Sequence, residues 1–135
     1  MYAPDHAAAA TVSDAVIQTA TVALSMLADP TRLRIMAHLV DGEQDVTALT
    51  AAVAAARPAV SQHLAKLRLA GLVTVRRDGR RSVYAVAGPH LQRLVTEALQ
   101  AAEHQVSDLG DSRRSAGRPG QPGGHENGRS GSLGE

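Results

Sequence analysis

Cysteine is absent from this chain of 135 residues, and so are phenylalanine and tryptophan. Without thiols the chain cannot form disulfides, iron–sulfur clusters, Cys-ligated zinc or a cysteine nucleophile. Only 1% of the residues are aromatic, which argues against binding of single strands by base stacking. No apolar run reaches the roughly 20 residues that span a bilayer, and the N-terminus lacks a secretory pattern. We therefore expect one small cytoplasmic domain without membrane association.

Charge is distributed unevenly, although the formal net charge is only +1. Residues 1–56 contain six acids and two arginines, whereas residues 57–81 contain seven basic residues and one acid. A basic block inside an otherwise acidic chain predicts a local surface for an anionic partner. An ordinary solvated surface is the alternative that charge alone leaves open.

The C-terminal end differs in composition from the middle of the chain. Residues 108–135 hold eight of the twelve glycines, together with prolines, serines and arginines. A segment of this kind cannot bury enough apolar surface to offset the entropy of ordering it. The sequence therefore predicts a flexible N-terminus at 1–12, a folded domain at 13–107 and a disordered tail at 108–135.

Apolar spacing and capping residues predict four helices in the folded domain, then a β-hairpin and a last helix. The helices are predicted to start at Ser13, Asp29-Pro30, Thr47 and Pro58. Two β-prone runs, 72–77 and 80–86, flank Asp78-Gly79, which favours a tight hairpin turn. The last helix covers about 89–107. This order predicts a mainly α fold with a β-hairpin, the winged helix-turn-helix.

The fourth predicted helix separates apolar residues from small and polar ones. On a helical wheel, Val60, Leu64 and Leu67 share one side. The opposite side carries Ser61, Gln62, Ala65 and Lys66. Such a face suits the major groove of DNA, because Gln can pair with adenine and Ser or Lys can bind base edges or phosphates. On this pattern alone, an ordinary amphipathic surface helix is the favoured interpretation.

The predicted hairpin supplies a second observation. With Asp78-Gly79 as the turn, Arg77 would face Arg80 and Arg76 would face Arg81. Like charges directly opposite on paired strands are unfavourable, so four arginines at one tip indicate phosphates as their partner. Duplex DNA is therefore the predicted partner. The predicted DNA-binding residues are Arg57, Ser61, Gln62, Lys66, Arg76, Arg77, Arg80 and Arg81.

Two stretches of the sequence resemble the ArsR/SmtB family of winged-helix repressors. Residues 27–35, LADPTRLRI, are similar to the family's second helix, and residues 60–73, VSQHLAKLRLAGLV, to its recognition helix. The Arg-Asp-Gly-Arg turn and Val83-Tyr84 resemble its wing. The resemblance covers about residues 16–107. It implies a homodimeric bacterial repressor, in which this domain binds DNA and dimerises, and which releases its operator when an inducer, usually a metal ion, binds.

The resemblance also implies a metal site on the last helix. The chain is most similar to the nickel- and cobalt-sensing actinobacterial branch, and the matching residues are His90, Glu103 and His104. The two histidines lie about 21 Å apart along one helix, so they would meet only between antiparallel helices of two subunits. Imidazole and carboxylate donors suit Ni²⁺ or Co²⁺ as inducer, with Zn²⁺ as a further candidate. Thiolate sensing is excluded, because the family's Cys-x-Cys motif is missing.

Several alternatives stay open at this point. Water, His125 or His6 would have to complete a six-coordinate site. The rival interpretation is a metal-independent winged-helix repressor whose last helix only dimerises. An enzyme is not expected, since the sequence contains no nucleophile elbow, phosphate-binding loop or HExxH motif. His63 is expected to pack structurally, and His38 to have no functional partner.

Overall fold

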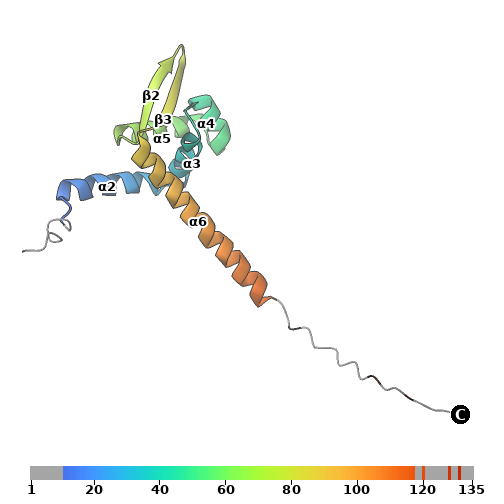
Figure 1. The fold of residues 1–135 in the computed structure, drawn as a ribbon. Helices are drawn as coiled ribbons and strands as arrows, with labels where there is room; N and C mark the ends of the chain where they lie inside the picture. Colours follow the sequence, from blue (N-terminus) through green and yellow to red (C-terminus); the bar gives the residue numbers. More distant parts are fainter. Residues whose placement is uncertain (1–10, 118–119, 121–127, 129–130, 132–135) are drawn as a thin grey trace, which may run out of the picture. The chain divides into compact units, whose positions relative to one another are not determined.

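The computed structural model describes residues 11–117 together with residues 120, 128 and 131 (Figure 1). Contacts divide the chain into two units, Met1–Ala102 and Glu103–Glu135. The elements are α2 (Asp14–Leu27), α3 (Pro30–Val40), β1 (Gln44–Asp45), α4 (Val46–Val53), α5 (Arg57–Leu69), β2 (Val73–Asp78), β3 (Arg81–Val86) and α6 (Pro89–Ala116). Within the described residues, no helix has the length and apolar character needed to cross a membrane.

Side-chain caps start three of the helices. The Ser13 hydroxyl caps α2 and the Asp29 carboxylate caps α3, each accepting a hydrogen bond from the backbone N–H three residues on, at 3.2 and 2.9 Å. Both caps were predicted from the sequence. Asp45 caps α4 in the same way at 2.8 Å, so this helix begins at Val46, one residue before the predicted Thr47.

The apolar core of the first unit lies between α3, α4, α5, the sheet and the start of α6. Its fully buried side chains are Ile35, Met36, Leu49, Val60, Leu64, Leu67 and Val95. No polar or charged side chain in the described part of the chain is buried with them. The core is therefore held by aliphatic packing, as the shortage of aromatic residues requires.

A third strand, which the sequence analysis did not predict, completes the sheet. The strand order is β1-β3-β2 and both pairings are antiparallel. In β1, Gln44 pairs with Tyr84 and Asp45 pairs with Val83. This short strand carries residues from the acidic first part of the chain to the edge of the hairpin, which extends away from the helices as the wing (Figure 1).

The hairpin turn lies one residue later than predicted. Asp78 pairs with Arg81, so the two turn residues are Gly79 and Arg80. Gly79 has a φ of 62°, a conformation that glycine adopts at the first position of a two-residue hairpin loop without steric cost. The strand register changes with the turn. The predicted opposition of arginine to arginine is therefore wrong, because Arg77 faces Ser82 and Arg76 faces Val83.

The last helix extends further than predicted. α6 continues past residue 107 to Ala116, so residues 108–116, expected in the disordered tail, are helical. Helix-breaking residues gather only from Gly117 onward, and an ion pair between Arg114 and Asp111 supports the last turns. Most of the predicted tail and flexible N-terminus, including His6 and His125, lies outside the described residues.

α2 leaves most of its large apolar side chains exposed. Leu27 is buried, whereas Val16 and Leu24 keep 56% and 54% of their surface accessible. Ile17 and Val22 are exposed as well. Val16, Ile17 and Leu24 lie within about 100° of one another around the helix, and an exposed apolar face of this kind usually marks an interaction surface.

Two leucines of α5 provide a matched test of this packing. Leu64→Ala should lower the free energy of unfolding by about 2–5 kcal/mol, because a fully buried side chain leaves a cavity. Leu69 is 92% exposed, so Leu69→Ala should change that free energy by less than about 0.5 kcal/mol. Urea unfolding at one protein concentration compares the two variants. Equal losses would contradict the buried face assigned to α5.

Candidate nucleic-acid interface

α5 presents an exposed polar face and a buried apolar face. Val60, Leu64 and Leu67 are fully buried. The predicted reading residues Ser61, Gln62 and Lys66 are exposed, as are Ala65 and Arg57. This burial agrees with the helical wheel derived from the sequence. The exposed face of α5 is therefore available to a partner such as a DNA groove.

The turn before α5 brings α4 and α5 close together. Ala54 ends α4 in a left-handed conformation, with a φ of 52°. Ala56 precedes α5 and provides no side-chain cap. The first N–H groups of a helix attract anions when no side chain caps them. The start of α5 therefore adds to the positive potential of Arg57.

Arg32 connects the start of α3 to α2 and α5. Its Nε donates a hydrogen bond to the Met26 carbonyl at 2.7 Å, and its Nη1 lies 3.3 Å from Nδ1 of His63. The backbone N–H of Arg32 lowers the pKa of Asp29, and the charges of Arg32 and His63 lower it further. The half-buried His63 thus contacts Arg32, a contact that fits the structural role expected of this histidine.

Two of the four wing arginines are bound to carboxylates. Arg76 donates two hydrogen bonds to Glu43, from Nη2 at 2.5 Å and from Nε at 3.0 Å. Arg81 donates one hydrogen bond from Nε to Asp45 at 2.8 Å. Acidic residues from the first part of the chain therefore lie beside basic residues of the wing. The net positive charge of the wing is smaller than the sequence suggests.

These contacts shift the acid–base equilibria of the groups involved. The hydrogen bond and charge of Arg76 lower the pKa of Glu43, and Glu43 raises the pKa of Arg76. The pKa of Asp45 is lowered first by the backbone N–H of Ala48 that it caps, and then by Arg81. All of these shifts favour the ionised pairs near neutral pH.

The other two wing arginines have no carboxylate within ion-pair distance in the described part of the chain. Arg77 donates a hydrogen bond to the Ser82 hydroxyl at 3.2 Å. Arg80 lies at the turn and is exposed. These two guanidinium groups can bind an incoming phosphate without first leaving an anionic partner.

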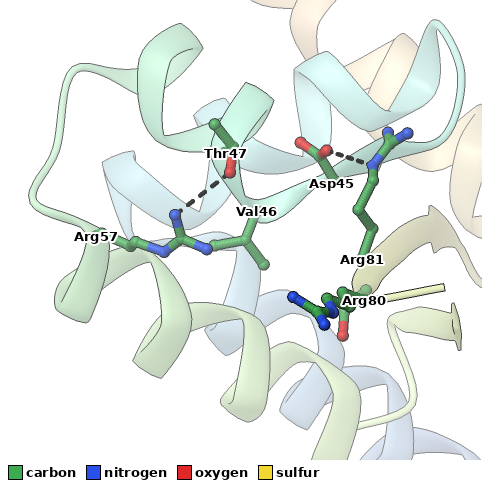
Figure 2. A pocket seen from close by; sticks show the side chains of 7 residues that line it. Asp45, Val46, Thr47, Arg57, Arg80 and Arg81 are labelled. Carbon is green, nitrogen blue, oxygen red and sulfur yellow. Dashed lines mark hydrogen bonds and ion pairs between the residues drawn. The ribbon is translucent and has the colours of Figure 1, made fainter. Parts of the chain in front are cut away.

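A small cavity of about 140 Å³ opens where α4, α5 and the wing meet (Figure 2). Its lining residues are Asp45, Val46, Thr47, Arg57, Arg80, Arg81 and Ser82. Arg57 donates a hydrogen bond from Nη1 to the Thr47 hydroxyl at 3.3 Å. The lining contains three guanidinium groups and one carboxylate, so its net positive charge suits a phosphate oxygen.

Sequence reasoning overlooked several residues of this region. Thr47 and Ser82 bind arginines of the predicted interface, and Glu43 and Asp45 neutralise two others. The only local indication of β1 in the sequence was the spacing of Glu43 and Asp45, which matches the two-residue period of a strand. A strand of two residues is too short for that signal to be recognised.

The predicted metal ligands His90, Glu103 and His104 are all exposed on α6. Nδ1 of His90 lies 2.9 Å from Nη2 of Arg93. Within a single chain, the described residues include no group of three His, Asp or Glu side chains that could hold a metal ion. The predicted site lies between two subunits, with His90 from one and Glu103 and His104 from the other.

Two helices joined by a tight turn and followed by a hairpin define a winged helix-turn-helix protein. Residues 29–75 match the family described as bacterial regulatory protein, arsR family. The HTH-type transcriptional regulator KmtR of Mycobacterium tuberculosis is 44% identical over 92 residues, which cover 68% of this chain and 71% of that protein. The HTH-type transcriptional regulator NmtR of the same organism is 40% identical over 105 residues, covering 78% and 87%. The chain belongs to the arsR family of bacterial regulatory proteins.

Solved structures agree with this assignment. The homodimeric winged helix-turn-helix DNA-binding domain Mb0332 of Mycobacterium bovis matches with a TM-score of 0.66 and 30% identity, covering 73% of this chain and 94% of that one. Rv0081 of Mycobacterium tuberculosis matches with a TM-score of 0.62 and 31% identity, covering 73% and 98%. The predicted fold and family are confirmed, and the protein is a DNA-binding transcriptional regulator rather than an enzyme.

The Arg76–Glu43 pair predicts a specific dependence of stability on pH. The folded pKa of Glu43 lies below that of the unfolded chain, so the pair stabilises the fold above the unfolded pKa and loses this effect as pH falls through the folded pKa. The free energy of unfolding should fall below about pH 4, and Glu43→Gln should show a smaller fall. Urea unfolding at a series of pH values measures both. Identical pH profiles would exclude a stabilising pair.

Proposed function

We propose that this protein is a cytoplasmic, metal-responsive repressor that binds duplex operator DNA as a homodimer and is released by Ni²⁺ or Co²⁺, or by Zn²⁺. One observation carries the DNA-binding part: the exposed polar face of α5 lies beside a wing and a cavity lined by arginines. The metal-responsive part follows from the family resemblance and from the donor atoms on α6.

The two parts of the interface have different tasks. Ser61, Gln62 and Lys66 would enter the major groove and contact base edges. The arginines would contact phosphates and so contribute affinity without sequence preference. Among them, Arg57, Arg77 and Arg80 are the leading candidates, because none forms an ion pair within the described residues. Arg76 and Arg81 would first have to leave their carboxylates.

A homodimer accounts for the exposed apolar face of α2. Exposure to water of the apolar side chains of Val16, Ile17 and Leu24 costs free energy, and a core as small as this one offsets little of that cost. A similar winged-helix domain from Mycobacterium bovis is homodimeric. A two-fold axis would place two copies of α5 in successive major grooves, roughly 34 Å apart, on an inverted repeat.

The inducer site would combine His90 of one subunit with Glu103 and His104 of the other. Their imidazole nitrogens and carboxylate oxygens suit Ni²⁺, Co²⁺ or Zn²⁺. Arg93 occupies Nδ1 of His90, which leaves Nε2 as the nitrogen open to a ligand. Shared ligation would fix the angle between the two last helices and disfavour the DNA-binding arrangement. A coupling of about 1–3 kcal/mol is typical for such allosteric links.

Two substitutions test the division between base reading and phosphate binding. Arg80→Ala should weaken binding to operator and random duplexes alike and flatten the dependence of affinity on salt. Gln62→Ala should instead reduce the preference for the operator over random DNA. Fluorescence anisotropy with both duplexes, over a range of salt concentrations, measures the two effects. If both variants changed affinity equally for all sequences, the assigned roles would be wrong.

A metal titration tests the inducer site. Wild-type protein bound to duplex from its own upstream region is followed by anisotropy with chelator, and then with Ni²⁺, Co²⁺ and Zn²⁺ separately. One metal should lower DNA affinity several-fold to about a hundred-fold. His104→Ala should bind DNA normally but lose this response, whereas the neighbouring exposed Gln105→Ala should keep it. A wild type that ignores all three metals would favour the metal-independent repressor, and a responsive His104→Ala would place the site elsewhere.

A further inference from the structure

The two ion pairs of the wing have a common arrangement. In each pair a wing arginine binds a carboxylate at or just before β1. The strand β1 pairs with the edge of β3 that faces away from β2. Asp78 adds a third acid on the same sheet face, because it pairs directly with Arg81. Arg76 and Arg81 are therefore each paired with a carboxylate in the DNA-free protein, although they belong to the predicted DNA-binding set.

The Glu43 carboxylate occupies one of the two edges with which the Arg76 guanidinium can bind an anion. It takes up Nε and Nη2 together, a fork that binds carboxylate or phosphate with two parallel hydrogen bonds. A phosphate at this edge has to displace Glu43, and a phosphate at the other edge meets a guanidinium whose charge Glu43 already balances. The Arg76 and Glu43 side chains are 54% and 46% exposed, so water screens the pair and a competing anion can replace the carboxylate.

The second pair differs in which partner is held in place. Asp45 is fixed by its hydrogen bond to the Ala48 N–H, and its side chain is only 18% exposed. Arg81 is joined to it through Nε alone and is largely exposed. The arginine can therefore swing towards a phosphate while the carboxylate stays at the start of α4.

From these contacts we propose that Glu43 and Asp45 compete with DNA phosphates for Arg76 and Arg81, and thereby limit the affinity of the protein for any duplex. This inference rests on the proposed DNA-binding function. Phosphate contacts carry no sequence information, so the competition lowers affinity for random DNA as much as for the operator. The acids thus keep the protein from being retained on non-specific DNA without altering base reading.

Isosteric substitutions remove the competing charges while keeping the local structure. Glu43→Gln removes the charge at an exposed site, and Asp45→Asn keeps a residue that can still cap α4. Asp41→Asn is the matched control. It makes the same change in net charge close to Glu43, but Asp41 forms no ion pair among the described residues. Thermal melting followed by circular dichroism checks that all three variants fold.

Anisotropy with operator and random duplexes over a range of salt concentrations gives the decisive comparison. Each of Glu43→Gln and Asp45→Asn should bind both duplexes about two- to fivefold more tightly than wild type, and more tightly than Asp41→Asn. The slope of log affinity against log salt should steepen by up to about 0.9 for each additional phosphate that the protein neutralises. Tighter binding of both duplexes with a steeper slope is the result expected.

Two outcomes would overturn the inference alone. If Glu43→Gln bound no more tightly than Asp41→Asn, the carboxylate would not compete with DNA. If Glu43→Gln bound more weakly, Glu43 would hold Arg76 ready for phosphate instead of restraining it. A wild type that binds no duplex at any salt concentration would overturn the proposed function itself, which distinguishes that failure from the other two.

Discussion

The aliphatic packing beneath α5 determines what the rest of the interface can do. Val60, Leu64 and Leu67 are completely buried, so the rotation of α5 about its axis is set by the core. That rotation exposes Ser61, Gln62 and Lys66 together on the opposite face. A helix that reads DNA must present its polar face in one fixed orientation. Within the described residues, the core provides this orientation without a fully buried aromatic residue or a buried polar side chain.

Electrostatic balance is the second constraint on this surface. A regulator must bind DNA firmly and also leave it, so an excess of unopposed arginines would be a disadvantage. The wing meets this requirement with two classes of cation. Arg77 and Arg80 have no carboxylate partner among the described residues, whereas Arg76 and Arg81 are shared with Glu43 and Asp45. The balance depends on exposed contacts, which can exchange partners at little cost.

The exposed apolar face of α2 indicates that a single chain does not bury all the apolar surface its sequence contains. The first unit has a complete core under α5, yet Val16 and Leu24 remain in contact with water. The candidate ligands on α6 form no group able to hold a metal ion among the described residues of one chain. The proposed homodimer would cover the apolar face of α2 and bring the ligands of two subunits together.

Local chemistry explains why much of this protein could be predicted from its sequence. Ser13 and Asp29 cap helices through bonds three residues away, and the wheel of α5 follows from the helical period. The motifs at 27–35 and 60–73, together with the residues of the wing, indicated the family. The register of the wing, the strand β1 and the pairs made by Glu43 and Asp45 were decided only by the tertiary structure. The strand β1 and the two ion pairs join residues more than thirty positions apart, and within the wing a one-residue shift of the turn changes every cross-strand neighbour.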